Sequence, residues 1–386
     1  MSIRLGIAGV RRGRSFLGAL RAAELEAVAA MDPDRVVLDQ FGELAGIPPG
    51  GRYTNYERLI AHGIDAVILG SPMPNHAPQA IMALQNNIHV LSEVTAAVTF
   101  DQCRRLRDAA RVSRAAYMMA ENYTYQKFCQ IVKAMAHAGL FGELYYAEGQ
   151  YLHDVRDLAH RPDGTFTWRK RWQLDRRGIT YPTHSIGPVL QWMQDRIVSL
   201  SARGSGNHTD ENYTGDDTAV MLCHTTKGGL VEIRTDLHSR RPHNMNYHLL
   251  QGTQGCYESP RGFGDDHKIY LAGRHGELKW YSLWDFESEF LPQDWRTHGE
   301  TAREAGHGGG DFLEMLDFAR ACHGEPPAID VYTALDWTLT GLVSELSVEK
   351  GGTPLPVPDP RTEELDRVAE VEIASGRFAW LVESVD

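Results

Sequence analysis

A tyrosine and a histidine stand three residues apart in the stretch Tyr181-Pro182-Thr183-His184. If residues 181–190 are helical, the two side chains share one face, because residues three apart are neighbours on a helix. Histidine titrates nearest physiological pH, so His184 is the first candidate to relay the proton of a reacting hydroxyl group. The stretch also fits a plain helix start, with Pro182 as the first helical residue.

A second tyrosine and histidine, Tyr151 and His153, are two residues apart in an alternating segment that begins at Leu144. Side chains two apart on a strand point to the same face, so this pair could act together as acid and base. A half-buried sheet face produces the same alternation and explains it nearly as well.

A basic stretch is the candidate for substrate recognition. Thr167-Trp168-Arg169-Lys170-Arg171-Trp172 places three consecutive bases between two tryptophans, in a chain with 51 acidic and 39 basic residues. Arginine forks bind sulfonate, phosphate or carboxylate groups, a lysine adds a point charge, and a tryptophan packs against a sugar ring. A solvated run of charges is the competing interpretation. The candidate substrate-binding residues here are Arg169, Lys170, Arg171 and Trp172.

A glycine turn follows the first apolar segment, Ile3 to Ala8, and reads Gly-x-x-Gly-x-x-x-Gly from Gly6. Small residues let the backbone approach a pyrophosphate, and the start of a helix offers its amides. The spacing differs from G-x-G-x-x-G, so a plain strand-to-helix turn is the alternative. The candidate cofactor-binding residues in this turn are Gly9, Arg11, Gly13, Arg14 and Ser15.

Asp32 closes the second apolar segment and stands where an acidic residue holds the ribose hydroxyls of NAD. The stretch Asp32-Pro33-Asp34-Arg35 fits a helix N-cap equally well.

Polar loops follow two further apolar segments, 65–70 and 88–91. Ligands of open α/β sheets bind at the carboxyl ends of strands, so both loops are expected beside the nicotinamide. A lone histidine at a helix start is more often structural than ligand-binding, which is the alternative for His76. The candidates in these loops are Ser71, Pro72, Asn75, His76, Glu93 and Val94.

The predicted pattern of strands and helices that positions these residues changes near residue 122. Strand and helix patterns alternate before it, with a helix expected from Ser15 to Ala23, which predicts βαβ units around a parallel sheet. Longer alternating segments follow and predict an open, mostly antiparallel sheet. We therefore expect an α/β protein with a Rossmann domain at 1–122 and an α+β substrate and oligomerisation domain at 123–386.

The composition limits the function classes. A net charge of −12 argues against nucleic acid or an anionic membrane as a partner. The five cysteines are scattered without a C-x-x-C pair, which indicates a reducing compartment and offers no metal site. With no leader pattern and no long apolar run, a cytoplasmic protein is expected.

The residues also carry a family resemblance. Residues 65–76, Ala83-Leu84 and 89–93 resemble the Gfo/Idh/MocA oxidoreductase family. Nearly the whole chain is similar to the NAD-dependent glycosidases of that fold, either the α-N-acetylgalactosaminidase type or the sulfoquinovosidase type. The matching stretches are 120–123, 148–154, 181–188, 306–312 and 330–345.

The resemblance implies hydrolysis assisted by a tightly held NAD. The sugar C3 hydroxyl is oxidised, a base removes the acidified C2 proton, and the aglycone leaves by elimination. Water then adds at C1, and the hydride returns to C3, so NAD is regenerated in each turnover. Such chemistry needs acid and base groups tuned near neutral pH rather than two carboxylates at a fixed separation.

The resemblance also suggests roles. His184 would relay the hydroxyl proton beside Tyr181, Tyr151 would contact the sugar or remove the C2 proton, and His153 would protonate the leaving group. Asn122 would meet the nicotinamide ribose or carboxamide. The remaining candidates for substrate binding are Glu121, His307 and Gly309, although Glu121 also fits a salt bridge and the loop at 306–310 also fits a helix entry.

One departure separates the chain from ordinary sugar dehydrogenases. The oxidoreductase family has a Glu-Lys-Pro segment, and this chain has Glu93-Val94-Thr95. The missing lysine argues against an NAD(P)-dependent sugar dehydrogenase, which stays open as the second alternative. A non-catalytic sugar-sensing protein is the third alternative. The basic stretch favours a glycoside with an anionic group such as sulfoquinovoside over a neutral or N-acetylated sugar. A homo-oligomer, dimer or tetramer, is expected from the family.

Overall fold

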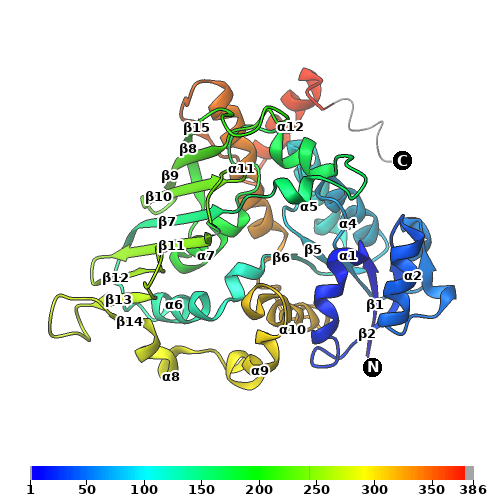
Figure 1. Ribbon diagram of the computed structural model, residues 1–386, viewed down its shortest axis with the longest axis horizontal. Coiled ribbons are helices and arrows are strands. Elements are labelled where there is room, and N and C mark those ends of the chain that lie inside the picture. The colour runs from blue at the N-terminus through cyan, green and yellow to red at the C-terminus, as the bar shows by residue number, and fades with distance from the viewer. Residues whose placement is uncertain (1, 243, 379–386) are drawn as a thin grey trace. The chain divides into compact units, whose positions relative to one another are not determined.

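A computed structural model describes residues 2–242 and 244–378 of the chain. The chain divides into two compact units. Of the described residues, unit 1 comprises 2–122, Gly299–Leu335 and 359–378, and unit 2 comprises Tyr123–His298 and Asp336–Pro358. Each unit has its own sheet (Figure 1).

Unit 1 contains a parallel sheet with the order β3-β2-β1-β4-β5-β6 among its described residues. Leu5, Ile7 and Ile68 are fully buried on it, as expected for a parallel sheet covered on both faces. The strands are β1 (Ile3–Ala8), β2 (Leu25–Met31), β3 (Arg52–Tyr53), β4 (Ala66–Leu69), β5 (His89–Glu93) and β6 (Tyr117–Ala120).

Side-chain caps fix where the helices of unit 1 begin. Asp34 accepts hydrogen bonds from the amides of Val36 and Val37, and Thr99 accepts one from Gln102, so the first turns keep partners for their amides. The helices are α1 (Val10–Gly13), α2 (Arg35–Leu44), α3 (Tyr56–Ile60), α4 (His76–Gln85), α5 (Phe100–Val112), α10 (Gly310–Cys322) and α12 (Glu364–Ser375).

Unit 2 contains a larger sheet with the order β14-β13-β12-β11-β7-β10-β9-β8-β15 among its described residues. Within these strands β7 and β10 pair in parallel, and the other neighbours pair antiparallel. The strands are β7 (Leu144–Leu152), β8 (Ile197–Gly204), β9 (Thr218–Thr225), β10 (Leu230–Asp236), β11 (Asn244–Gly252), β12 (Gly255–Glu258), β13 (Lys268–Leu271), β14 (Tyr281–Ser282) and β15 (Leu355–Pro356).

Helix α7 packs closely on β7. A Cβ atom at Gly149 would lie 2.0 Å from the carbonyl oxygen of Ser185, so only glycine allows this approach of strand and helix backbone. The helices of unit 2 are α6 (Lys127–His137), α7 (Thr183–Met193) and α8 (Glu287–Phe290), while α9 (Gln293–Arg303) and α11 (Val331–Glu349) contain residues of both units.

The predicted fold class, a Rossmann-type parallel sheet followed by an open and mostly antiparallel sheet, is confirmed. The structure differs in how the chain is divided, because residues 299–335 and 359–378 pack with unit 1 instead of forming one unit with 123–298. The helix expected from Ser15 to Ala23 is replaced by α1 and a 3₁₀ segment, Arg14–Ala19.

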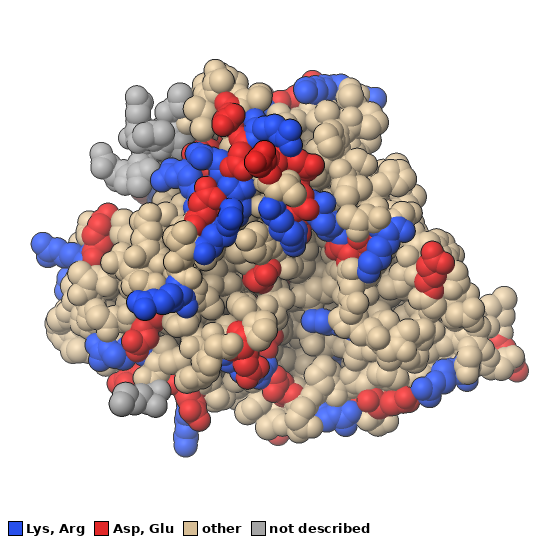
Figure 2. All heavy atoms as spheres, turned by 180° about the vertical axis from the view of Figure 1, so that it is seen from behind, with Lys and Arg blue, Asp and Glu red and all other residues tan. Residues whose placement is uncertain are grey.

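Acidic and basic side chains are interspersed on the face drawn in Figure 2. Within the described residues, no helix is both long enough and apolar enough to span a membrane. The same residues hold no group of three or more His, Cys, Asp and Glu side chains arranged to bind a metal ion.

Candidate active site

The glycine turn of unit 1 is built for close backbone packing. Gly9 has a left-handed φ of 79°, and a Cβ atom there would lie 2.3 Å from the carbonyl carbon of Gly70. A Cβ at Gly13 would lie 2.4 Å from Ile7 Cγ2. Of the other residues predicted here, Arg11 is exposed and pairs with Asp34, while Arg14 and Ser15 begin the following 3₁₀ segment.

Asp32 lies directly after β2 and is 7% exposed. Its Oδ2 accepts a hydrogen bond from the Val10 amide (3.2 Å), and its Oδ1 accepts one from the Asp34 amide (3.0 Å). Burial raises the pKa of this carboxyl group. The stretch 32–35 does contain a helix N-cap, because Asp34 caps α2, whereas Asp32 itself does not cap that helix. The role of Asp32 at the ribose stays a prediction.

His76 is a structural link between the two strand-end loops. Its Nδ1 lies 2.8 Å from the carbonyl oxygen of Thr95 and its Nε2 lies 2.9 Å from that of Ser71. The ring is 2% exposed, and burial lowers its pKa. Of the other residues predicted for the cofactor in this loop, Ser71 is buried, Pro72 precedes a single 3₁₀ turn, and Asn75 is the last residue of that turn.

Arg12, which sequence reasoning did not select, is the centre of a charge cluster in unit 1. Its Nε lies 2.6 Å from Glu93, and its two terminal nitrogens lie 2.8 and 2.7 Å from the carboxylate of Asp311. Burial alone would lower the pKa of Arg12, but the two carboxylates outweigh it and raise the pKa. Asp311 also accepts hydrogen bonds from Asn122 Nδ2 (2.9 Å) and His307 Nδ1 (3.0 Å).

Glu314 lies one turn along α10 from Asp311 and is fully buried. Neither of its carboxyl oxygens has a hydrogen-bond partner among the described residues. Burial, together with the charges of Asp311 and Glu93, raises its pKa well above the usual range and so favours the protonated, neutral form of this side chain.

The end of β6 offers a polar group that suits a dinucleotide. Asn122 is 2% exposed, and its Oδ1 has no hydrogen-bond partner among the described residues. A ribose hydroxyl or a carboxamide is a donor that this oxygen can accept from. Together with the glycine turn and Asp32, these residues fit NAD.

Two predicted substrate residues lie in unit 1 beside this cluster. Glu121 is fully buried, and His307 is held by Asp311 in a turn where Gly308 and Gly309 have φ values of 64° and 97°. Val94, at the position of the family lysine, is an apolar side chain with 4% exposure. No cation therefore replaces that lysine at residue 94 itself.

Unit 2 brings the four predicted catalytic residues together. Tyr151 Oη and His153 Nδ1 are 2.6 Å apart, and Tyr181 Oη lies 3.3 Å from His184 Nε2. The ring of Tyr151 lies 4.9 Å from that of His184, and the ring of Tyr123 packs edge-on against His184 at 4.2 Å. The result is two tyrosine–histidine pairs in one largely buried cluster.

A fifth residue, His248, holds the start of α7. Its Nε2 lies 3.1 Å from the backbone carbonyl oxygen of His184, and its pKa is lowered by burial to about 4. The carbonyl of His184 would normally receive the amide four residues later, but that residue is Pro188, which has no N–H. Proline inside the predicted helix was the sequence signal that a donor must come from elsewhere.

The basic stretch is largely paired within unit 2. Lys170 Nζ lies 2.9 Å from Asp175 and 2.7 Å from the carbonyl of Asn212. Arg169 lies over the ring of Trp168 and donates to Gln173 at 2.7 Å, and Arg171 and Trp172 belong to the same short π-helical segment, Lys170–Leu174. Lys170, one of the three bases expected to bind an anion, is therefore already paired with the carboxylate of Asp175.

Two family models match the chain. "Oxidoreductase family, NAD-binding Rossmann fold" matches residues 3–121, and "Glycosyl hydrolase 109, C-terminal domain" matches residues 125–364. A glycosyl hydrolase family 109 protein of Shewanella pealeana is 31% identical over 93% of this chain and 85% of its own length. One of Streptomyces filamentosus is 32% identical over 93% of this chain and 77% of its own.

Solved structures support the fold. A levoglucosan dehydrogenase in complex with NADH superposes with a TM-score of 0.78 at 16% identity, over 93% of this chain and all of that one. An inositol dehydrogenase homologue of Azotobacter vinelandii, with NADH and myo-inositol, gives a TM-score of 0.72 at 17% identity, over 92% of this chain and 98% of that one. With its NAD-binding Rossmann domain and its matching C-terminal part, the chain belongs to glycosyl hydrolase family 109.

Proposed function

We propose that the protein is an NAD-dependent glycosidase that hydrolyses its substrate by transient oxidation at C3 of the sugar. The observation that carries this proposal is the cluster of two tyrosine–histidine pairs, Tyr151 with His153 and Tyr181 with His184. Bound NAD would supply the hydride acceptor and return the same hydride, so the reaction is hydrolysis without net oxidation. Asp32, Asn122 and the glycine turn would hold it.

Each pair would manage one proton. His184 Nε2, close to Tyr181, accepts the proton of the C3 hydroxyl as that carbon loses its hydride. Tyr151 removes the C2 proton, the C1–O bond breaks, and His153 returns a proton to the departing oxygen. Water then adds across the C1–C2 double bond with its oxygen on C1 and a proton on C2, and the C3 carbonyl is reduced back to the alcohol.

The pairing of charges favours an uncharged sugar. Lys170 is compensated by Asp175, and Arg176 is paired with Glu345 where both side chains are 8% exposed. A sulfonated sugar such as a sulfoquinovoside is the second candidate, because Arg169 contacts the neutral Gln173 and Trp168 and, in the described part of the chain, no carboxylate. The uncharged class comes first because the argument for the second rests on Arg169 alone.

The test uses p-nitrophenyl glycosides of an uncharged, an N-acetylated and a sulfonated sugar, with NAD⁺ in D₂O. Glycosidase action predicts release of nitrophenol, deuterium at C2 of the sugar and no accumulation of NADH. Steady NADH formation from a free sugar would establish a dehydrogenase instead. Absence of turnover with every glycoside and every free sugar would favour a non-catalytic sugar-binding protein.

A variant pair locates the chemistry. His184→Ala is expected to abolish turnover while leaving NAD⁺ binding, measured by titration calorimetry, within about twofold. The matched control is His137→Ala, an exposed histidine of α6 that lies 2.9 Å from the Gln191 carbonyl oxygen and should keep full activity. Near-normal turnover of the His184 variant would refute the assignment.

A further inference from the structure

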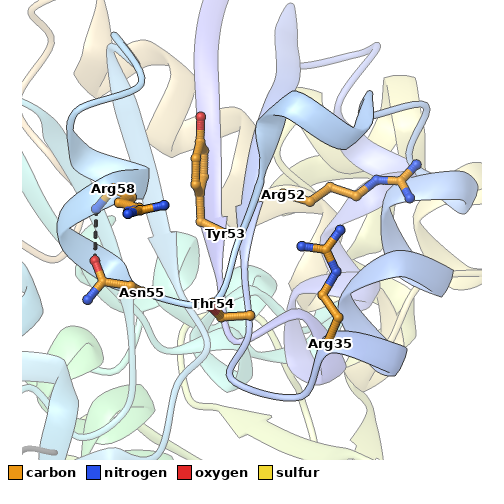
Figure 3. A pocket seen from close by; sticks show the side chains of 6 residues that line it. All are labelled: Arg35, Arg52, Tyr53, Thr54, Asn55 and Arg58. Atoms are coloured by element: carbon orange, nitrogen blue, oxygen red, sulfur yellow. Dashed lines mark hydrogen bonds between the residues drawn. The ribbon is translucent and has the colours of Figure 1, made fainter.

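A cavity of about 470 Å³ opens beside the carboxyl ends of β2 and β3 in unit 1. Its lining is polar and carries three arginines: Arg35, Arg52, Tyr53, Thr54, Asn55 and Arg58. Figure 3 shows Arg35 and Arg52 on one side of the Tyr53 ring, with Arg58 and Asn55 on the other. The charged groups therefore come from the start of α2, from β3 and from α3.

The arginines that line the cavity carry more positive charge than the carboxylate paired with them neutralises. Arg35 and Arg52 share one partner, Asp39, at 2.8 and 3.4 Å. The guanidinium group of Arg58 contacts no carboxylate within residues 2–242 and 244–378, and its backbone amide is the group bonded to Asn55 Oδ1. Three guanidinium groups against one carboxylate make this cavity suited to a doubly charged anion.

The position of the cavity suggests which anion. Tyr53, in its wall, pairs with Met31 in the sheet, and its carbonyl oxygen accepts the amide of Asp32 at 3.2 Å. The cavity thus adjoins the acid predicted to hold the adenosine ribose. In dinucleotide folds an arginine near this strand end accommodates a phosphate on the 2′ oxygen of that ribose.

We propose that this cavity binds the 2′-phosphate of NADP, so that unit 1 accepts NADP as well as NAD. The proposal rests on Asp32 as the ribose ligand. Both oxygens of Asp32 already accept backbone amides, which spread its charge and reduce its repulsion of a neighbouring phosphate. NADP carries the same hydride chemistry, so the reaction itself is unchanged.

The test is a set of binding titrations on the full chain after removal of bound nucleotide, with NAD⁺, NADP⁺, 2′-AMP, 5′-AMP and inorganic phosphate. We expect the Kd of NADP⁺ within tenfold of that of NAD⁺, and 2′-AMP to bind at least fivefold more tightly than 5′-AMP. A larger NADP⁺ penalty, or equal binding of the two nucleotides, overturns the proposal. Phosphate binding without preference for NADP⁺ or 2′-AMP would assign the cavity to a separate phosphate ligand and overturn it as well.

Variants tie the preference to the cavity. Arg58→Gln and Arg35→Gln should each weaken NADP⁺ and 2′-AMP at least fivefold and leave NAD⁺ within twofold. Arg52 is not substituted, because its guanidinium group packs against Gly42 and its loss would also change the packing there. The control, Arg105→Gln on the exposed face of α5, should change none of these constants. Unchanged NADP⁺ binding in both cavity variants overturns the proposal, and because these are binding measurements, they are independent of glycosidase activity.

Discussion

The imidazole of His248 donates a hydrogen bond to the backbone carbonyl of His184 over 3.1 Å, in the place of an amide that Pro188 cannot supply. The bond requires the Nε2–H tautomer, and the lowered pKa of about 4 keeps that ring neutral at pH 7. His248 is therefore a positioning residue for the proposed proton relay, and it acts through the helix backbone rather than on the sugar.

Removing this donor should misplace the relay. His248→Leu leaves a buried carbonyl without a partner, which lowers the free energy of unfolding by about 1–3 kcal/mol. We expect kcat to fall more than tenfold with KM within threefold. Chemical denaturation and steady-state kinetics measure the two effects.

Two further variants serve as a control and as a rescue for His248→Leu. His267→Leu removes a half-buried histidine of the same aromatic cluster, one that stacks on Phe128 and hydrogen-bonds with Tyr257. It should cost stability but retain kcat. Pro188→Ala restores an amide to the His184 carbonyl, so the double variant with His248→Leu should regain activity; equal loss in single and double variants would contradict the positioning role.

The same histidine makes stability depend on pH. Its pKa is about 4 in the folded protein against 6.5 unfolded, because burial disfavours the charged ring. Between these values the unfolded chain binds the proton and the folded chain does not, so stability is lost as the pH falls from 6.5 towards 4. The slope from this group is about 1.4 kcal/mol per pH unit. Thermal unfolding of His248→Gln should show a shallower acid slope than the unmodified chain, and an equal slope would disprove the link.

Glu314 should act in the opposite direction. Its folded pKa is raised well above 4.5 by burial and by neighbouring carboxylates, so the folded chain keeps a proton that the unfolded chain releases. Stability from this group is lost as the pH rises above 4.5, by about 1.4 kcal/mol per unit until the folded pKa is reached. Glu314→Gln removes the titration and should stabilise the protein at pH 8 relative to pH 5. A constant difference across that range would show that Glu314 is ionised in the folded state.

Asp311 should be essential to the fold of unit 1. Asp311→Asn leaves Arg12 with Glu93 as its remaining carboxylate partner within the described residues. Breaking a buried ion pair costs about 3–5 kcal/mol, and the 21% exposure of the Arg12 side chain places the expected loss at the lower end. NAD⁺ affinity should fall as well, because Asp311 also orients Asn122.

The control, Glu289→Gln, breaks an exposed pair with Arg274 and should change the free energy of unfolding by no more than about 0.5 kcal/mol. An equally small effect of Asp311→Asn would contradict the prediction.

Local sequence patterns were enough to predict most of the strands and helices and both tyrosine–histidine pairs. The first strand, Ile3–Ala8, begins and ends with the apolar segment from which it was predicted. The predicted catalytic residues meet because their partners are two or three positions away in the chain. Strand β3, with two residues, is too short to leave a periodic pattern.

The contacts that the sequence could not predict join distant positions. Arg12 and Asp311 are 299 residues apart, and His248 and His184 are 64 apart, so no spacing rule connects them. In the basic stretch, the carboxylate that pairs with Lys170 belongs to Asp175, which lies outside the run of bases, so the run alone did not reveal this ion pair. Oligomeric state, cytoplasmic location and the sulfonated substrate remain predictions.

The bond between Arg12 and Asp311 sets an order of events during synthesis. Arg12 leaves the ribosome near the beginning of translation, and its strongest partner follows 299 residues later. At about 5–20 residues per second, the nascent N-terminal segment waits roughly 15–60 s for that carboxylate. Until then Glu93 is the one carboxylate partner of Arg12 among the described residues, so the charge cluster around Arg12 is completed only late in synthesis.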